Sequence, residues 1–316
     1  MLNFHTTKWL VLVILLLLLL TVPFWGAAYV VYFCFLFCLY LALSQMWNFL
    51  IGYSGLFSLA QPAFIGITGY TMAVLTSYYG VNVFLSLLLG GIISVIFALF
   101  MSLFIFRLKG IYFGIITLLF ADSLMLLFGN WEYIKYSQGM FIKPTPAPSM
   151  STIYYCAFIV GVGSVILVYL MLRSKIGLGL MAIRDDEEVA SLIGIGLFRS
   201  KLYCFLIAAF VTGITGGVYY TMQIFIMPAE AFSIGWSIKM IFMVIIGGIA
   251  TVEGPIVGAF IYVLLSQWLA EYFSVNMLIL GAIAIMVIIL APQGIMGTLQ
   301  GRLKFELLTP RRRLEK

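Results

Sequence analysis

Charged residues are scarce in this sequence, and their scarcity excludes a soluble protein. Only 9% of the 316 residues are Asp, Glu, Lys or Arg, whereas 64% are hydrophobic and the mean hydropathy is +1.17. Ordinary globular domains contain about a quarter charged residues, because a soluble surface needs charge to stay dispersed. Lipid accommodates far more apolar surface. The composition therefore predicts an all-α, polytopic integral membrane protein that forms a single domain over residues 1–316.

Histidine and cysteine are also scarce, which argues against a metal site or a catalytic centre. His5 is the only histidine, and Cys34 and Cys38 add just two possible ligands on one helix face. The acidic run at 185–188 has no second cluster with which to hold Mg²⁺ and a diphosphate. No Gly-Lys dipeptide occurs, so the GxxxxGK phosphate-binding loop is missing. We expect a non-enzymatic chain without a cofactor, and any ATP and Mg²⁺ would be bound by a partner chain.

Long apolar runs predict eight to ten membrane-spanning helices. A spanning helix needs about 20 apolar residues to cross a hydrocarbon core of about 30 Å. The first run follows Lys8 and also fits a signal peptide, but the apolar sequence resumes at Tyr29, which favours an uncleaved first helix. Ten runs are candidates, of which the third, eighth and ninth are short or broken by Gly and Pro: residues 9–26, 28–47, 61–80, 83–106, 111–129, 152–172, 202–223, 236–252, 255–272 and 275–291.

The Lys and Arg residues predict how these helices are oriented. With the N-terminus inside, ten crossings place 14 of the 17 Lys and Arg residues in cytoplasmic connections or the tail. Such juxtamembrane charges suit lipid head groups, so no nucleic-acid partner is expected. We expect both termini in the cytoplasm, with a cytoplasmic loop at 173–201 and a basic tail at 302–316. The proline-interrupted connection Trp131–Ser149 is expected outside, either as a binding site for a soluble partner or as a solvated linker.

The loop at 173–201 contains a candidate docking element. Its glycine-framed sequence predicts one short helix with four carboxylates in the early turns, where the helix dipole favours negative charge. An i, i+3, i+4 apolar triplet follows, and a glycine ends it. A helix this short is not stable alone. We therefore expect it to lie on the membrane, to dock into another protein or to pack on its own bundle. The candidate docking residues are Ala182, Ile183, Arg184, Asp185, Asp186, Glu187, Val189, Leu192, Ile193 and Gly194.

Two glycine-interrupted segments, 52–66 and 247–259, are candidates for a translocation pathway. Backbone polar groups must be satisfied within the membrane, so such breaks line a cavity or a close helix contact. The two segments share a Gly, hydroxyl, Pro spacing of three and four residues, as expected for an inverted or parallel duplication near a substrate route. The pathway candidates, together with one intramembrane carboxylate, are Gly55, Ser58, Gln61, Asp122, Gly248, Thr251 and Pro255.

Asp122 is that carboxylate, and it lies in the middle of the run at 111–129. A bare carboxylate is costly in hydrocarbon, so Asp122 is expected to face the bundle interior, either hydrogen-bonded or protonated. It would tie two helices together or contact the solute. Proton-coupled transport usually uses several titratable groups, and no histidine lies within the predicted spans. From the residues alone, a stand-alone secondary transporter or channel for a small polar solute stays an alternative.

Five motifs in order give the chain a resemblance to a known family. They are GYSGLFSL at 52–59, RLKGIYF at 107–113, GLMAIRDDE at 179–187, the glycines of 247–259, and Pro-Gln-Gly at 292–294. From about Leu41 to Leu299 the sequence resembles the integral-membrane subunit of branched-chain amino-acid ABC importers, of the LivM/LivH type. The second and third motifs are more similar to the LivM member.

The resemblance implies an importer of the prokaryotic inner membrane, assembled from several chains. It implies a second related permease, two ATP-hydrolysing subunits and an extracytoplasmic substrate-binding protein. In that assembly the element at 184–193 corresponds to the coupling helix that docks into an ATPase. Family members carry leucine, isoleucine, valine, other amino acids, short amides or urea. Ala60, Pro62 and Ala250 depart from the family pattern, so the resemblance does not single out one solute.

Overall fold

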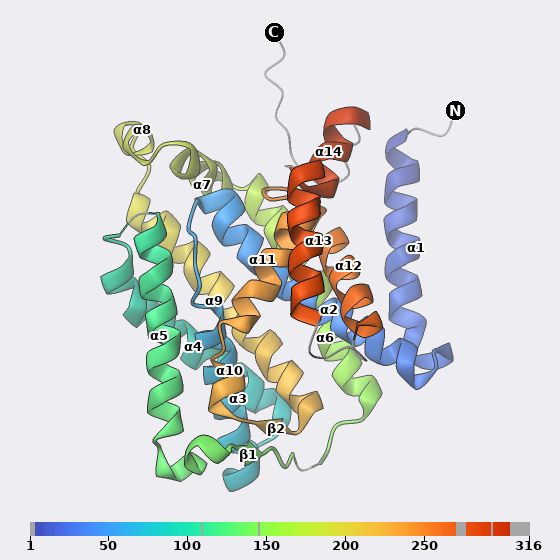
Figure 1. The fold of residues 1–316 in the computed structure, drawn as a ribbon, viewed down its shortest axis with the longest axis vertical. Coiled ribbons are helices and arrows are strands. Elements are labelled where there is room, and N and C mark those ends of the chain that lie inside the picture. The colour runs from blue at the N-terminus through green and yellow to red at the C-terminus, as the bar shows by residue number, and fades with distance from the viewer. Residues whose placement is uncertain (1–3, 109, 145, 270–275, 292, 304–316) are drawn as a thin grey trace.

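The computed structural model describes residues 4–108, 110–144, 146–269, 276–291 and 293–303, and the secondary structure of these residues is almost entirely helical (Figure 1). This confirms the predicted all-α class. The described elements, in order, are α1 (Phe4–Trp25), α2 (Ala28–Asn48), the π-helical turn η1 (Phe49–Tyr53), α3 (Gln61–Tyr79), α4 (Val83–Ile105), α5 (Ile111–Gly129), the 3₁₀ turns η2 (Glu132–Ile134) and η3 (Tyr136–Gln138), β1 (Met140–Phe141), α6 (Met150–Arg173), α7 (Lys175–Asp185), α8 (Glu187–Leu192), α9 (Leu197–Gln223), β2 (Phe225–Ile226), α10 (Pro228–Ala231), α11 (Gly235–Gly247), α12 (Gly254–Trp268), α13 (Asn276–Leu290) and α14 (Gly294–Leu303).

All ten predicted apolar runs contain helices, although the runs 255–272 and 275–291 lie partly outside the described residues. Six helices in the described part of the chain are long and apolar enough to cross a membrane. The other four are shorter in their apolar part, as in α1, α12 and α13, or more polar, as in α3. The six spans are Ala28–Tyr53, which joins α2 to η1, then α4, α5, α6, α9, and Pro228–Gly247, which joins α10 to α11.

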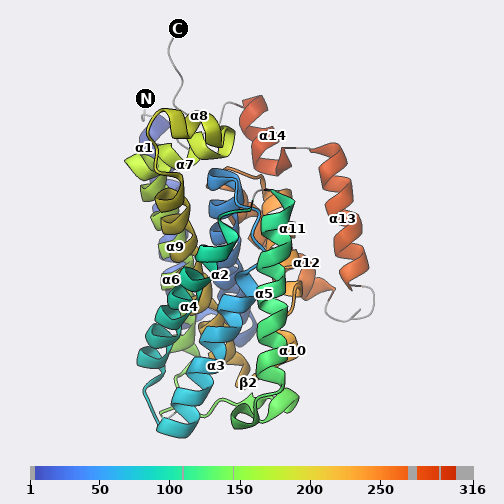
Figure 2. The ribbon, with the colours of Figure 1, turned by 90° about the vertical axis from the view of Figure 1, so that its left-hand side faces the viewer.

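The helices form one bundle whose connections gather at two opposite ends (Figures 1 and 2). α7, α8 and α14 lie at the end where α1 begins, and β1 and β2 lie at the other end. This arrangement agrees with the predicted parity, in which the N-terminus, the loop at 173–201 and the chain after residue 301 share one side. Residues 304–316 of the predicted tail lie outside the described residues.

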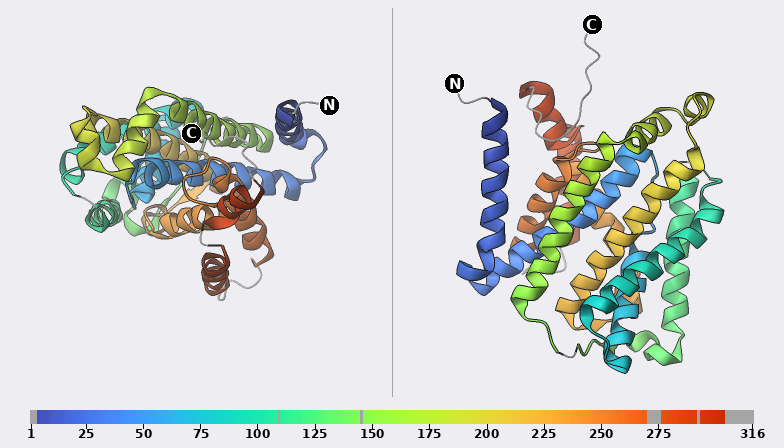
Figure 3. Two further views of the ribbon diagram at one scale, coloured as in Figure 1. Left: turned by 90° about the horizontal axis from the view of Figure 1, so that it is seen from above. Right: turned by 180° about the vertical axis from the view of Figure 1, so that it is seen from behind.

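α2 forms the centre of the bundle, and α1 stands at its edge. The span that begins with α2 is 72% buried, the highest fraction of the six, and it packs against α6, α12, α9 and α11. α1 lies apart in Figure 3 and exposes most of its leucines, as a lipid-facing helix does. Of the elements of the candidate site, α11 and α12 pack on α2, and α7 packs on the π-helical turn that continues it.

The connection Trp131–Ser149 is not helical throughout, as its prolines predicted. It contains η2 and η3, and then β1 pairs antiparallel with β2 in the register Met140 to Ile226 and Phe141 to Phe225. This short ladder ties the α5–α6 connection to the α9–α10 connection. Whether a soluble partner binds the connection stays a prediction.

Candidate coupling site at two broken helices

The first helix break follows α2. The helix continues as the π-helical turn η1 and ends at Gly55, whose φ of 71° is a conformation that glycine adopts without strain. The Leu56 amide then donates to the Leu50 carbonyl over 3.0 Å, which satisfies one of the helix-terminal carbonyls. Extended chain leads to α3, which has Pro62 in its first turn.

The second break lies between α11 and α12 and has the same construction. α11 ends at Gly247, and Gly248 follows with a φ of 125°. The Thr251 hydroxyl donates to the Gly248 carbonyl over 2.9 Å and accepts from the Gly254 amide over 3.0 Å. α12 begins there with Pro255 in its first turn. The predicted Gly, hydroxyl, Pro spacing therefore marks real helix ends and starts.

The two breaks also match in direction. Ser58 corresponds to Thr251, and its hydroxyl accepts from the Ala60 amide over 3.2 Å just before α3. α2 runs toward the end that holds α7, because Arg184 of α7 contacts its last turn. α11 also runs toward that end, since it follows β2 at the opposite end (Figure 1). Of the two kinds of duplication that the spacing allowed, the structure is compatible with the parallel one.

Two buried amides of α2 join the breaks to each other. Asn48 donates from Nδ2 to the Thr251 carbonyl over 2.8 Å and accepts from the Ala250 amide at Oδ1 over 2.9 Å. One turn earlier, Gln45 donates from Nε2 to the Val252 carbonyl over 2.7 Å. Asn48 and Gln45 are fully buried. Side chains from one broken helix therefore satisfy main-chain groups of the other, as buried polar groups require.

Gly52 lets the two segments approach this closely. A Cβ atom at Gly52 would lie 2.6 Å from Asn48 Oδ1 and 2.8 Å from the Ala250 nitrogen. Both distances are shorter than van der Waals contact allows. Asn48 and Gln45 are not among the residues predicted from the sequence. Their signal was present, because they are polar residues three apart in an otherwise apolar run.

The prediction of a single helix in the loop at 173–201 is wrong, because the chain forms two. α7 ends at Asp185, and Asp186 is the N-cap of α8, where its Oδ1 accepts from the Glu188 and Val189 amides over 2.8 and 3.1 Å. An N-cap aspartate leaves the preceding helix, since its own backbone is extended. Glu187 and Glu188 then lie in the first turn of α8, as the helix dipole favours.

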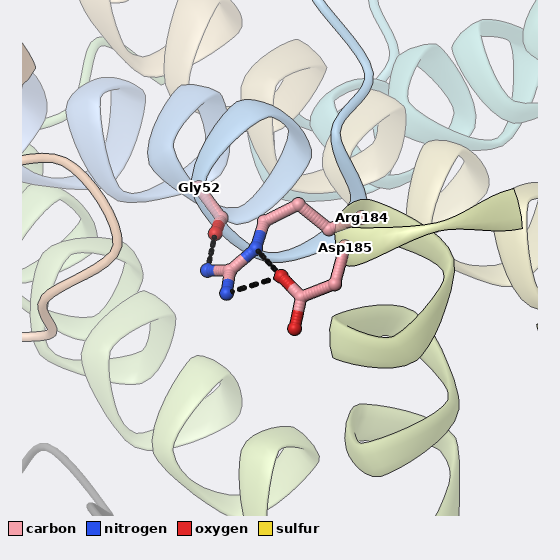
Figure 4. Close-up of polar contacts among 3 residues, drawn as sticks. All are labelled: Gly52, Arg184 and Asp185. Atoms are coloured by element: carbon pink, nitrogen blue, oxygen red, sulfur yellow. Dashed lines mark hydrogen bonds and ion pairs between the residues drawn. The ribbon is translucent and has the colours of Figure 1, made fainter.

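Arg184 connects this element to the first break (Figure 4). Its Nη1 donates to the Gly52 carbonyl over 2.8 Å, while Nε and Nη2 donate to Asp185 Oδ1 over 3.0 and 2.8 Å. Gly52 lies in the last turn of a long helix, where carbonyls lack intrahelical partners and the dipole favours a cation. Asp185 therefore orients the guanidinium, and Arg184 caps the helix end that holds Asn48.

The docking candidates divide into a buried and an exposed group. Ile183 is buried and Ala182 half-buried, so they pack on the bundle. Val189, Leu192 and Ile193 are 53%, 86% and 68% exposed, which is unusual for an apolar triplet on a helix at the end of a bundle. Gly194 ends the element with a φ of 84°, as predicted.

A buried ion pair holds α8 against α9. Lys201 Nζ lies 2.5 Å from Glu187 Oε1, and the Lys201 side chain is only 6% exposed. The pair lies beside an open groove of about 560 Å³ that is also lined by Phe106, Leu192 and Phe198. Leu192 therefore belongs to both the exposed triplet and the lining of the groove.

The pathway candidates are only partly brought together. Thr251, Gly248 and Pro255 lie at the second break, and Ser58 and Gln61 lie fully buried beyond the first. Neither amide atom of Gln61 has a hydrogen-bond partner among the described residues. Gly55 is exposed, with Arg184 Cα 3.4 Å from the position of its missing Cβ.

Asp122 does not join this group. It lies on α5, is half-buried, and makes no hydrogen bond or ion pair within the described ranges. The prediction that Asp122 faces a bundle interior therefore stays a prediction.

Comparison with known proteins gives consistent matches. The family model for the branched-chain amino acid transport system permease component matches residues 29–291. The high-affinity branched-chain amino acid transport system permease protein LivM of Salmonella typhimurium is 26% identical, covering 85% of this chain and 70% of the relative. The Escherichia coli LivM is also 26% identical, covering 94% and 77%. A probable LivH of Methanocaldococcus jannaschii is 24% identical, covering 79% and 86%. No solved structure matches the chain significantly.

Proposed function

This chain belongs to the family of branched-chain amino acid transport system permease components, and from this premise we propose that it is driven by separate ATPase subunits through α7 and α8. It is a multi-pass protein of the prokaryotic inner membrane and a transport component rather than an enzyme. The observation that carries the proposal is the hydrogen bond from Arg184 to Gly52, because it connects the exposed element directly to the broken helices.

The proposed orientation places the end with α7 and α8 in the cytoplasm. Arg173, Lys175, Arg184, Arg199 and Lys201 all belong to this end, and cytoplasmic loops are enriched in such residues. ATP is a cytoplasmic ligand, so an ATPase subunit would meet the chain there. The external face would then be the end with β1 and β2, where a substrate-binding protein delivers the solute.

The exposed triplet of α8 is the proposed contact with the ATPase. Three neighbouring apolar side chains exposed to water are costly in an isolated chain but typical of a helix that docks into a groove. The acidic first turn of α8 beside the triplet would pair with basic groups at the rim of that groove. Such a partner would bind ATP and Mg²⁺ itself, as this chain's lack of a phosphate-binding loop requires.

Movement of the docked element would reach the pathway through three contacts. Arg184 holds the last turn of α2 and η1, Asn48 of that helix holds the second break, and Thr251 ties the break to the start of α12. A ligand or partner shifts an equilibrium only by contacts that differ between the two states. The contact that we expect to differ is the Arg184 cap, because the Arg184 side chain is still 34% exposed and its guanidinium can be hydrated again.

The proposed solutes are branched-chain amino acids, and other amino acids, short amides or urea are the alternatives. The relatives' names state the first class. Gln61 is the proposed contact, because its buried amide has both a donor and an acceptor without partners among the described residues. A polar solute would satisfy both.

The proposal is tested on the complex purified from its native membrane. A second permease and a nucleotide-binding ATPase should accompany the chain, and reconstituted vesicles should take up solute only with ATP. Leu192→Asp should reduce uptake at least tenfold while leaving the chain in the membrane, because the charge opposes apolar docking. Leu178→Asp, at a leucine of α7 that is also exposed, is the matched control and should retain uptake.

Two results would overturn the proposal. Unchanged uptake in Leu192→Asp would remove α8 as the ATPase contact. Uptake without ATP by the chain alone would favour a stand-alone transporter or channel instead. In that case Asp122 would be the first residue to replace.

A further inference from the structure

We propose that the exposed face of α5 that borders Asp122 is the surface on which the second permease subunit binds, and that this subunit donates a hydrogen bond to the Asp122 carboxylate. The inference rests on the proposed function, which supplies a second permease but says nothing of where it binds. It starts from the Asp122 carboxylate, which lies within a membrane-spanning helix and has no partner among the described residues.

α5 divides into a buried and an exposed face. Phe113, Thr117 and Ala121, four residues apart, are buried against the bundle, and the Thr117 hydroxyl accepts from the Leu59 amide over 3.0 Å. Phe120 packs against Phe97 of α4 at a ring distance of 6.2 Å. Only 22% of this span is buried, the lowest fraction of the six. α5 is therefore the span that this chain covers least.

Asp122 is half-buried and lies on the same side of α5 as three exposed residues. Ile115, Leu119 and Leu126 precede or follow it by seven, three and four residues, so all share one side of the helix. They are 48%, 55% and 63% exposed. Asp122 is also seven residues from the end of α5, which is about 10 Å of helix rise, and its short side chain cannot span that distance to reach water.

A lipid-facing carboxylate at this depth is unfavourable. Ionisable residues within a membrane face a bundle interior or a water-filled cavity, and they pair with donors there. Because Asp122 is only half-buried in this chain and has no partner among the described residues, the interior that receives it has to be completed by another chain. Interfaces between membrane helices commonly contain such interhelical hydrogen bonds. An apolar face with one buried acceptor fits a permease helix that carries one donor.

Photo-crosslinking in the purified complex tests this assignment. A benzoylphenylalanine replaces Leu119 on the α5 face in one variant and Ile96 on α4 in the matched control. Both positions are exposed in this chain, at 55% and 60%. We expect Leu119 to crosslink to the second permease and Ile96 to crosslink only to lipid. Crosslinks to the second permease from Ile96 alone, or only lipid adducts at Leu119, would overturn the inference.

The carboxylate itself is tested by Asp122→Asn and Asp122→Leu. Asn retains an acceptor oxygen, so the second permease should still co-purify in near-normal amount. Leu removes the acceptor and leaves the partner's donor unsatisfied, so the yield of the second permease should fall at least fivefold. Equal yields for both variants would contradict the donor. If no second permease accompanies the unmodified chain, the proposed function fails, whereas its presence without α5 crosslinks refutes this interface alone.

Discussion

Asn48 and Gln45 offer a direct test of the contact between the two broken helices, because they are buried amides on the same face of α2 that differ in one respect. Asn48 uses both ends of its amide, on the Ala250 amide and the Thr251 carbonyl. Gln45 uses only its nitrogen, on the Val252 carbonyl, and its oxygen has no partner among the described residues. Replacing each with Leu keeps most of the side-chain volume and removes the polar groups.

The expected losses differ because of the groups left behind. Each main-chain group that loses its partner while buried costs about 1–3 kcal/mol. Asn48→Leu leaves two such groups, one buried and one half-buried, so the free energy of unfolding should fall by about 2–4 kcal/mol. Gln45→Leu removes one hydrogen bond but also an unpartnered buried oxygen of similar cost, so the loss should be about 0–1 kcal/mol.

The measurement is unfolding of each variant by SDS titration in mixed micelles, followed by tryptophan fluorescence. Circular dichroism of the untreated variants checks that helical content is unchanged. Equal losses for the two variants would contradict this prediction, because Asn48→Leu leaves more main-chain groups without partners than Gln45→Leu does. A larger loss for Gln45→Leu would also show that the amide oxygen of Gln45 is satisfied in the membrane.

Three other expectations use the same micelles or vesicles. Gly52→Ala should lower the free energy of unfolding by about 1–3 kcal/mol, because the added methyl group would overpack against the second break. Gly163→Ala on α6, where the added methyl group meets open space, should raise the free energy of unfolding by up to about 1 kcal/mol through helix propensity. The reverse order would exclude close contact at Gly52. Glu187→Ala should destabilise the chain more than Lys201→Met, because only the former strands a buried ammonium, and equal unfolding midpoints would show that Lys201 reaches water. Gly248→Leu should abolish uptake in vesicles, since φ is 125° there and the Gln293 carbonyl lies 3.1 Å from the position of its missing Cβ; normal uptake would remove the second break from the pathway.

The helices were predictable because a membrane-spanning helix requires a long run of apolar residues, which the hydropathy along the chain shows directly. Every apolar run proposed from the sequence contains a helix. The helix before each proposed break ends at a glycine with positive φ. The error at Asp186 came from reading the acidic run as the interior of one helix. Asp is a favoured N-cap, and Glu187 and Glu188 belong to the first turn that follows it, so the sequence did contain the boundary.

The contacts between the breaks were harder to predict for a physical reason. Asn48 and Thr251 are 203 residues apart, and the groups that Asn48 binds are main-chain atoms of a loop. Main-chain groups leave no side-chain signature, so the sequence shows that a polar residue lies in an apolar run but not what satisfies it. For Asp122, the rule that charges face a bundle interior applies to an assembly as well as to one chain, so the sequence predicts burial without naming the partner.

The position of Arg184 shows why a long helix with a broken end suits a transporter. The span Ala28–Tyr53 is buried without interruption from Cys38 to Leu50, so its body cannot move without repacking the centre of the bundle. Its last turn is different, because η1 departs from regular α-helical hydrogen bonding and is held from two sides, by Arg184 and through Asn48. Small movements at a partner-binding surface reach distant sites when the connecting element has two alternative packings. The π-helical turn is capped by Arg184 and lies between the docking element and the second broken helix. Two alternative packings of this turn would therefore differ little in free energy. Coupling through it would leave the centre of the bundle intact.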